Sequence, residues 1–423
     1  MGGSIILARL FYNLFSILLV IPMLVKLYKP KNDQPQFGLR WVEHFGFGSK
    51  GCFDIWVHAV SVGEVIGITP LIVELKQQQP ELNILITTTT ATGAEQVEKQ
   101  LSALVEHRYA PLDFWPCVWL FFSRYQFKQY WIMETELWPN CLAFAKRRRV
   151  KVVLVNARMS QRSEKRYQKL KFTRSMVFSN LDLVLAQTEA DAQRFESLGS
   201  TLVSTTGSLK FDLSDPKAWQ TQAVKLQPSL FGERSIWVIA SSHEAEEPQV
   251  HQLLMKVLKT EPNALCIWVP RHPERFSAVA QTLEQNKIRY CRRSQQQQPS
   301  FDTQVYLADT MGEMMLWYSM AEVAFIGGSL CLVGGHNYLE AAAVACPCVA
   351  GCSDFNFVLI SQQLQAVSHL YLSDDLDSLC QKITDYLQDP VLVQRDGQAG
   401  LQIVQQNRGA LHRTLEALTI NSK

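Results

Sequence analysis

The sequence lacks the patterns that mark several common classes of protein. Its ten cysteines are scattered without CxxC spacing and there is no HExxH, so we predict free thiols in a reducing compartment and no metal site. The GxGxxG dinucleotide fingerprint is missing, as are zinc-finger spacing, a helix-turn-helix and an RRM signature. Charged residues are few, at 19% against 47% hydrophobic, which excludes a disordered chain. We therefore expect a globular protein that needs no cofactor and binds no nucleic acid.

One long apolar stretch is present, at the N-terminus. Residues 4–28 are almost wholly apolar, interrupted by Arg9, Asn13 and Pro22, and the stretch approaches the roughly 20 residues that span a bilayer. It lacks the basic start and the cleavage site of a secretory signal. We predict a retained membrane-associated helix over residues 1–30, which either spans once or lies in the interface. A helix buried against its own domain is the alternative.

The length of 423 residues predicts two domains. From residue 53 to residue 206 strand and helix patterns alternate, which predicts a parallel sheet with helices on both faces. Residues 208–234 break the alternation and contain proline and glycine, so we predict a linker there. The alternation then restarts. We expect two Rossmann-like domains facing a cleft, over residues 31–207 and 235–423, whose last helix either closes the second domain or crosses back to the first.

The run from Trp56 to Glu64 predicts a buried strand that passes through a small-residue turn into a helix. Glu64 then lies in the first helical turn, at the edge of the sheet where α/β folds bind ligands. Ser61 and Glu64 have capping-box spacing, so a capping role is the simpler interpretation and catalysis the alternative. The helix dipole should lower the pKa of this carboxyl group and burial should raise it, and the sequence does not decide between them.

A basic block lies inside a chain whose net charge is only +2. Between Lys146 and Arg174 there are twelve Lys or Arg residues and one acid, Glu164, which is +11 over 29 residues. Such a run is usually a solvated face. Together with the apolar N-terminus, this density favours contact with an anionic membrane surface.

Several predicted helix starts in the second half could hold anionic groups. Arg271 follows a strand and opens a helix, which suits a phosphate, although an ion pair with a nearby carboxylate is equally consistent. The glycines of Gly327–Gly328 let backbone approach a ligand closely. Asn337 and Glu340 are three residues apart, so they either face one ligand, such as a ribose, or form an N-cap.

Seven motifs, in order along nearly the whole chain, resemble those of the Kdo transferases of lipopolysaccharide synthesis, where Kdo is 3-deoxy-D-manno-octulosonic acid. Each motif alone is weak, and their linked order makes the resemblance specific. They are HAVSVGE at His58–Glu64, ETELWPN at Glu134–Asn140, NARxSxRS at Asn156–Ser163, SLKFD at Ser208–Asp212, PRHPER at Pro270–Arg275, DTMGE at Asp309–Glu313 and GGHNxLE at Gly335–Glu340.

The resemblance implies an inverting, metal-independent glycosyltransferase of the B-type fold. Such enzymes transfer Kdo from CMP-Kdo to the lipid A precursor, lipid IVA, at the cytoplasmic face of the inner membrane. By the matching motifs Glu64 is the general base, and Glu134 and Lys210 stabilise the transition state. The residues implied to bind CMP are Pro270, Arg271, Met311, Gly312, Glu313, Asn337, Tyr338, Leu339 and Glu340.

The chain departs from the family pattern in three places. The family usually has proline where Tyr338 stands and again where Ala342 or its neighbour stands. Gly351–Phe357 reads GCSDFNF where the family commonly shows GPHxxNF. No residue assigned to catalysis is lost, so we expect an active enzyme. The alternatives are another nucleotide-sugar glycosyltransferase of the same fold, or a catalytically inert membrane-associated binding protein.

Overall fold

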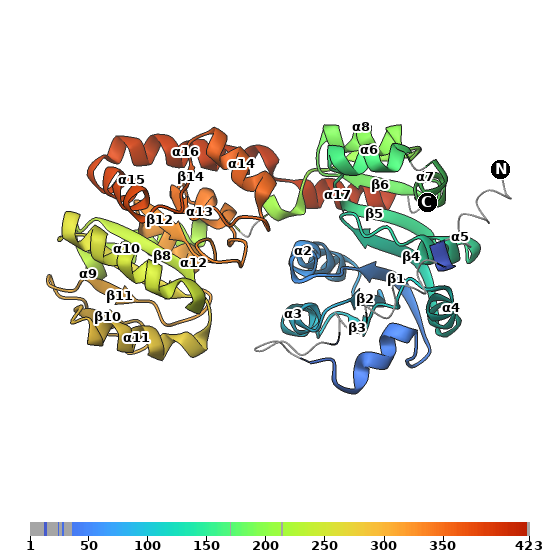
Figure 1. The fold of residues 1–423 in the computed structure, drawn as a ribbon, viewed down its shortest axis with the longest axis horizontal. Coiled ribbons are helices and arrows are strands. Elements are labelled where there is room, and N and C mark those ends of the chain that lie inside the picture. The colour runs from blue at the N-terminus through green and yellow to red at the C-terminus, as the bar shows by residue number, and fades with distance from the viewer. Residues whose placement is uncertain are drawn as a thin grey trace. The chain divides into compact units, whose positions relative to one another are not determined.

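The fold was analysed in a computed structural model, which describes residues 12–14, 24, 28, 36–169, 171–212 and 215–420. The chain divides into two compact units (Figure 1). Unit 1 comprises Met1–Asp212 together with Arg408–Lys423, and unit 2 comprises Leu213–Asn407. Each unit has its own parallel sheet of seven strands, as the alternation of strand and helix patterns predicts.

The sheet of unit 1 has the strand order β3-β2-β1-β4-β5-β6-β7, and every neighbouring pair is parallel. Its strands are β1 Gly51–His58, β2 Ile84–Thr88, β3 Glu106–Tyr109, β4 Tyr125–Met133, β5 Lys151–Ala157, β6 Leu183–Ala186 and β7 Val203–Thr205. The helices of this unit are η1 Gly38–Phe45, α2 Val62–Gln78, α3 Ala91–Leu101, α4 Trp115–Arg124, α5 Pro139–Arg147, α6 Gln161–Lys169, α7 Lys171–Phe178, α8 Glu189–Ser197, η2 Leu209–Phe211 and α17 Ala410–Ile420.

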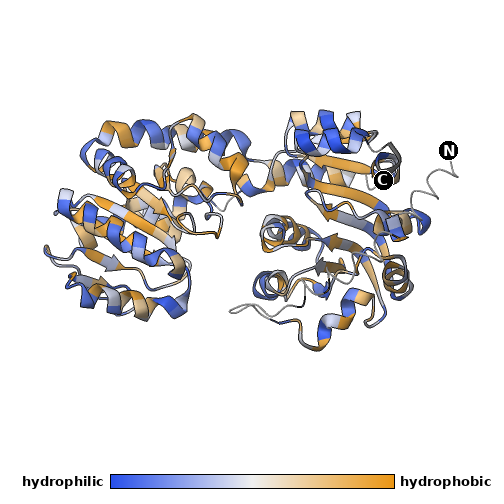
Figure 2. Ribbon diagram, viewed as in Figure 1, coloured by the Kyte–Doolittle hydropathy of each residue, from blue (hydrophilic) through white to orange (hydrophobic). Residues whose placement is uncertain are grey.

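Helices cover both faces of this sheet (Figure 2). The central strands carry apolar side chains on each of their two faces, and a separate layer of helices buries each face. On one face Trp56 of β1 stacks on Tyr130 of β4, with ring centroids 3.8 Å apart, under α4, α5, α7 and α8. On the other face Ile55 and Val57 pack under α2, α3 and α17. The helix that carries Glu64 is therefore fixed to the central strands of the sheet.

The sheet of unit 2 has the strand order β10-β11-β9-β8-β12-β13-β14 and is also parallel throughout. Its strands are β8 Ile236–Ser242, β9 Leu265–Pro270, β10 Tyr290–Arg292, β11 Val305–Leu307, β12 Val323–Ile326, β13 Cys348–Ala350 and β14 Leu370–Leu372. Its helices are α9 Lys217–Phe231, η3 Glu244–Glu246, α10 Glu247–Thr260, η4 Pro273–Arg275, α11 Phe276–Gln285, α12 Met314–Met320, α13 Leu339–Ala343, α14 Val358–Ala366, α15 Leu376–Gln388 and α16 Pro390–Asn407.

The segment predicted as a linker, residues 208–234, is mostly helical, so that prediction is wrong. Helix α9 occupies Lys217–Phe231 and packs against α12, and the two units divide after Asp212. Ala223 and Phe231 are the buried residues of α9, and Pro228 lies within it. Because so few of its side chains are buried, the helix has no strong apolar period in the sequence.

The last helix, α17, belongs to unit 1. Of the two alternatives for this helix, the chain therefore takes the one in which it crosses back to the first domain. The carboxylate of Asp212 accepts hydrogen bonds from the backbone N–H groups of Gly409 (2.6 Å) and Leu411 (2.5 Å) at the start of this helix. Arg413 donates to the carbonyl of Thr206 (2.9 Å). These contacts explain why residues before and after unit 2 fold together.

The predicted membrane-associated helix over residues 1–30 lies almost wholly outside the described residues. Within the described ranges, no helix combines the length and apolar character needed to cross a bilayer. Tyr12 donates to the buried carboxylate of Asp113 (2.8 Å). Asn13 and the buried Asn140 exchange amide hydrogen bonds of 3.0 and 3.2 Å. Asp113 also accepts from the backbone N–H groups of Asn140 (3.1 Å) and Cys141 (2.9 Å). Residues 12–14 therefore contact the start of α5 directly through Asn13 and indirectly through Asp113.

Candidate functional site

Glu64 lies at the junction of β1 and α2 and forms the capping contacts that its spacing predicts. Ser61 is the N-cap residue, and its hydroxyl accepts from the Glu64 N–H (3.4 Å). The Glu64 carboxylate in return accepts from the Ser61 hydroxyl (3.0 Å) and from the backbone N–H of Val60 (2.9 Å). The side chain is therefore held in one orientation at the carboxyl end of the central strand.

The same carboxyl group is poised to exchange a proton near neutral pH. Glu64 is only 8% exposed, and this burial raises its pKa from 4.5 to about 8. The hydrogen bond from Val60 opposes the rise in pKa, whereas the negative charges of Glu136 and Glu134 support it. Burial therefore outweighs the hydrogen bonds from Val60 and Ser61. A general base works best with a pKa near the working pH.

Glu134 and Lys210 are brought together although they are far apart in the sequence. Lys210, in η2, donates to the Glu134 carboxylate (3.1 Å), and Arg158 bonds its other oxygen (2.8 Å). Glu134 follows β4 and Arg158 follows β5, so the carboxyl ends of two neighbouring strands supply this cluster. Arg158 is a member that our sequence analysis did not single out, although it stands in the NARxSxRS motif.

The backbone around this cluster is held in an uncommon conformation. Glu134 and Asn156 both have φ of 53°, in the left-handed region that residues other than glycine rarely adopt. Asn156 accepts a hydrogen bond from the backbone N–H of Leu209 (3.1 Å) through its side chain and one from Gln187 (2.8 Å) through its carbonyl. Asn156 therefore fixes the segment that carries Lys210. Strained residues of this kind are typical of functional sites.

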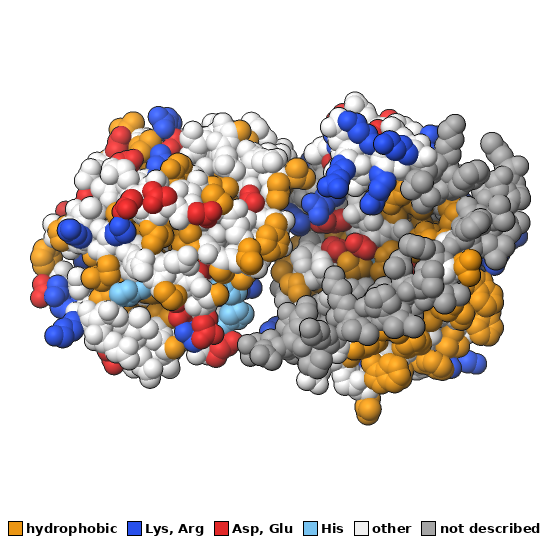
Figure 3. Space-filling view, in the orientation of Figure 1, with side chains coloured by type: hydrophobic (Ala, Val, Ile, Leu, Met, Phe, Trp, Pro, Cys, Tyr) orange, Lys and Arg blue, Asp and Glu red, His pale blue; other side chains and the backbone are white. Residues whose placement is uncertain are grey.

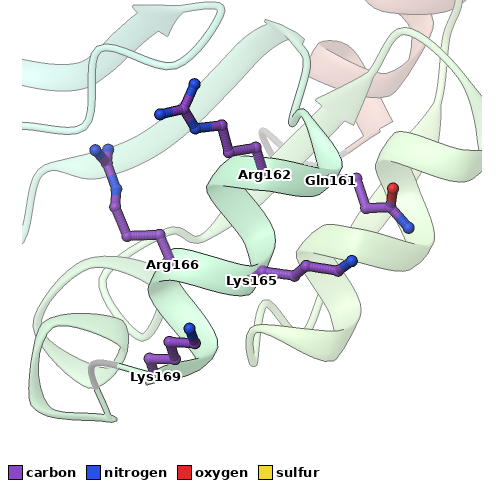
Figure 4. Close-up of a pocket in the computed structure, with 5 residues that line it drawn as sticks. All are labelled: Gln161, Arg162, Lys165, Arg166 and Lys169. Carbon is purple, nitrogen blue, oxygen red and sulfur yellow. The ribbon is translucent and has the colours of Figure 1, made fainter.

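Part of the basic block forms a pocket on unit 1. Figure 4 shows the residues of α6 that line it, with Arg162 and Arg166, one turn apart, extending on the same side of the helix. No residue of α6 is buried. Figure 3 shows Lys and Arg side chains gathered over this part of unit 1. The full lining is Gln161, Arg162, Lys165, Arg166 and Lys169.

Exposed aromatic side chains lie on η1, on α4 and between β1 and η1, and the sequence analysis missed them. Trp115 and Trp119 are each about half exposed and stack with ring centroids 6.4 Å apart. Trp41 and Phe47 are exposed to a similar degree. Figure 3 shows hydrophobic side chains gathered on the lower part of unit 1. Tryptophan is typical of surfaces that meet a membrane interface.

In unit 2, the predicted CMP residues fall after the carboxyl ends of β9, β11 and β12. Pro270 ends β9 and the exposed Arg271 follows it. Glu340 is buried, which raises its pKa, while the Asn337 amide (3.3 Å) and the charge of Arg271 lower it. The Asn337 side chain also accepts from the N–H of Leu339 (3.1 Å). Asn337 is nevertheless not the N-cap residue of α13, which is Tyr338, and no side chain caps this helix. The charge of Arg271 reaches Glu340.

Two of the predicted CMP residues have no exposed side chain. Tyr338 and Leu339 are fully buried, and the N–H of Leu339 is already bonded to Asn337, so neither residue presents a surface to a ligand in this structure. On the neighbouring loop the side chain of Met311 is exposed and Gly312 has φ of 85°. Glu313 is partly buried, which raises its pKa, but its hydrogen bonds to Arg293 and Thr310 outweigh this and hold the pKa below its usual value.

The glycine pair after β12 serves a side chain of the protein itself. The buried carboxylate of Glu246 accepts from the N–H groups of Gly328, Ser329 (3.1 Å) and Leu330 (3.1 Å). A Cβ at Gly327 would lie 2.7 Å from a Glu246 oxygen and 2.6 Å from the Ser241 carbonyl oxygen. The close backbone approach predicted for a ligand is therefore used for this internal carboxylate.

Comparison with known proteins decides the family. The family model described as 3-deoxy-D-manno-octulosonic-acid transferase (kdotransferase) matches residues 39–213. The 3-deoxy-D-manno-octulosonic acid transferase of Haemophilus influenzae is 38% identical over 91% of this chain and 92% of its own length. The chain belongs to the Kdo transferase family. It is accordingly a glycosyltransferase that transfers Kdo in lipopolysaccharide synthesis.

Two solved structures are similar to this chain. A domain titled the C-terminal CMP-Kdo binding domain of WaaA from Acinetobacter baumannii is 34% identical, covers 45% of this chain and 99% of its own, and gives a TM-score of 0.43. HepE from Anabaena, in complex with UDP, covers 88% of this chain and 100% of its own at 13% identity, with a TM-score of 0.52. The second likeness shows that the Kdo transferase has the two-sheet fold of B-type glycosyltransferases.

Proposed function

We propose that this Kdo transferase uses CMP-Kdo as its donor and the lipid A precursor, lipid IVA, as its acceptor. The observation that carries the proposal is the buried Glu64 carboxyl group with its pKa of about 8, held beside the Glu134–Lys210–Arg158 cluster. A hydroxyl that attacks an anomeric carbon needs a base of this kind within hydrogen-bond reach.

In the proposed reaction Glu64 takes the proton of the attacking acceptor hydroxyl. The hydroxyl oxygen forms a bond to the anomeric carbon of Kdo, and the bond from that carbon to the phosphate oxygen breaks. The electron pair leaves with CMP, and attack from the opposite side inverts the anomeric centre. Lys210 and Arg158 supply positive charge to the anionic sugar in the transition state, and Glu134 orients both cations. No step requires a metal.

For the donor, the resemblance assigns CMP to unit 2. Arg271 is exposed and carries a permanent charge that suits a phosphate. Glu340 and Asn337 lie next to it and offer acceptors and a donor for ribose hydroxyls. Met311, Gly312 and Glu313 are proposed to contact CMP from the neighbouring loop, and the fully buried Tyr338 and Leu339 are proposed to support the CMP site from beneath.

For the acceptor, the basic pocket on α6 suits the phosphates of the lipid A precursor. We propose that the protein works at the cytoplasmic face of the inner membrane. The exposed tryptophans of α4 and the basic block both support contact with an anionic membrane surface. The apolar N-terminal segment, residues 1–30, is proposed to associate with the same membrane.

Mass spectrometry of the reaction product tests the proposal. The purified protein is incubated with a tetraacylated lipid A precursor and either CMP-Kdo or a set of UDP-sugars. We expect mass increments of Kdo from CMP-Kdo alone, and the number of increments gives the number of sugars added. Transfer from a UDP-sugar and none from CMP-Kdo would refute the donor. Products on another acceptor, with none on the lipid A precursor, would refute the acceptor.

A further inference from the structure

Three histidines from different parts of unit 2 meet at one edge of its sheet. His243 follows β8, His272 follows β9, and His336 lies in the loop after β12. The rings of His243 and His336 lie nearly parallel and meet edge to edge, with centroids 4.9 Å apart, planes inclined by 7° and Nε2 atoms only 2.8 Å apart. His272 lies edge-on to His243 at 5.2 Å. Nothing in the sequence motifs predicts the contact, because His243 and His336 are 93 residues apart.

The short contact between the two Nε2 atoms fixes the protonation of the pair. Such a hydrogen bond requires a proton on one Nε2 and a lone pair on the other. Burial, together with the charge of Arg271 and the neighbouring histidines, lowers the pKa of His243 to about 4 and that of His336 to about 3. Both rings are therefore neutral at neutral pH. The His243 side chain accepts from the backbone N–H of Glu246, so its Nδ1 carries no proton and its Nε2–H donates to His336. His336 therefore carries its own proton on Nδ1, which is the one N–H that the pair can offer to a ligand.

A single buried carboxylate holds both rings in place. Glu246 accepts from the backbone N–H of His243 (3.0 Å) and from the N–H groups of Gly328–Leu330. Gly328 in turn accepts from the N–H of Gly335 (2.8 Å), directly before His336. A Cβ on Gly328, whose φ is 69°, would approach the His336 ring to 3.1 Å. The scaffold thus sets the separation of the two rings, which is the arrangement expected of a preorganised site.

The position of the pair in the fold points to the class of ligand. The chain adds β9 on one side of β8, and later β12 on the other side, so the sheet has its switch point between β8 and β12 (Figure 1). Open α/β sheets bind ligands at the carboxyl ends of the strands beside this point. His243 and His336 flank it, and Arg271 is close enough to influence both rings and Glu340.

We propose that the His243–His336 pair binds the phosphate of the sugar-nucleotide donor, next to the cation of Arg271. This proposal rests on the proposed function, since it concerns the donor of the same reaction. Arg271 supplies the permanent charge and the pair supplies a neutral N–H donor aimed at a phosphate oxygen. As the bond between the anomeric carbon and that phosphate breaks, the oxygen gains negative charge and its hydrogen bond to the pair strengthens.

Comparison of CMP with cytidine isolates the phosphate. We would measure the affinity of the detergent-solubilised full-length protein for each ligand by calorimetry, in the wild type and in the variants His243→Ala and His336→Ala. Alanine at either position removes one ring and, with it, the Nε2 contact that fixes the tautomer and orientation of the other ring. We expect each variant to bind CMP about tenfold to a hundredfold more weakly and cytidine unchanged, because the hydrogen bond from the pair to the charged phosphate is lost.

His272→Gln is the matched control. This ring is in the same cluster but makes no hydrogen bond to the pair among the contacts of the described residues, so its CMP affinity should change less than about threefold. The double variant of His243 and His336 should lose no more affinity than either single variant, because the two rings act as one unit. Unchanged melting temperatures would show that the variants are folded.

The outcomes separate this proposal from the proposed donor. An equal loss of CMP and cytidine affinity would overturn the phosphate site and indicate a structural role. Unchanged CMP affinity in both variants would overturn it as well, as would a wild type that binds neither CMP nor UMP. If the wild type binds UMP rather than CMP, and the variants weaken UMP binding but not uridine binding, the histidine pair is confirmed and only the CMP donor is wrong.

Discussion

Replacing Glu64 by glutamine should abolish transfer and stabilise the fold at the same time. Glutamine is isosteric with glutamate, so it keeps a carbonyl oxygen for the N–H of Val60. It cannot take a proton from the acceptor hydroxyl. It also carries no charge that burial would penalise. Loss of activity together with a gain in stability distinguishes a desolvated base from a helix cap, whose removal costs stability.

The size of the gain follows from the pKa of Glu64. Folding raises the pKa of this carboxyl group from 4.5 to about 8. Between these two pH values the group ionises readily in the unfolded chain but not in the folded protein, so the free energy of unfolding falls as the pH rises. At about 1.4 kcal/mol per pKa unit, the cost is about 1 kcal/mol at pH 5, about 3 kcal/mol at pH 7 and close to its limit of about 5 kcal/mol at pH 9. Glutamine removes this cost.

Urea unfolding at pH 5, pH 7 and pH 9 tests these numbers in parallel with the transfer assay. The difference in unfolding free energy between Glu64→Gln and the wild type should grow with pH. Glu81→Gln, at an exposed loop position, is the control and should show no such trend. A gain that is the same at all three pH values would refute the desolvation of Glu64. Transfer retained by Glu64→Gln would refute its role as the base.

Four further results are expected. Transfer by the wild type should rise about tenfold per pH unit up to about pH 8 and then level off, because the base must lose its proton; a flat profile between pH 6 and pH 9 would contradict this. Lys210→Ala should lower kcat about 10²–10³-fold with little change in donor KM, as single-turnover kinetics can show. Arg166→Gln with Lys169→Gln should weaken binding of the anionic acceptor about thirtyfold at low salt, whereas Lys225→Gln, exposed on α9, should not. Trp119→Ser should shift the protein from sedimenting vesicles toward the supernatant, and unchanged partitioning would place the membrane contact elsewhere.

Local patterns predicted the elements of this fold better than they predicted its chemistry. The spacing of Ser61 and Glu64 predicted the capping contacts, and these are confirmed. The raised pKa of Glu64 could not be predicted from that spacing, since it depends on packing and on two acids that follow β4. Glu134 and Lys210 are 76 residues apart, and only the family resemblance linked them before the structure did.

Two misinterpretations have the same physical origin. The glycines after β12 indicated a ligand, but the group that approaches them is Glu246, 82 residues earlier in the chain. The segment before β8 was predicted as a linker because α9 buries few of its own residues. In both cases the deciding contact is with a distant part of the sequence, which no local window contains.

The contacts of Tyr12 and Asn13 have a practical consequence for anyone who wants a water-soluble version of this protein. Cutting off residues 1–28 removes both side chains, so Asp113 loses the hydrogen bond from Tyr12 and Asn140 loses its two bonds with Asn13. Asp113 keeps the bonds from the backbone N–H groups of Asn140 and Cys141. Each lost hydrogen bond costs about 0.5–1.5 kcal/mol. Both groups brace the helix that follows the Glu134 loop. Lost activity after truncation would then reflect a loosened loop as well as the loss of the proposed membrane contact. Polar replacements along the apolar segment that spare these two positions would separate solubility from catalysis.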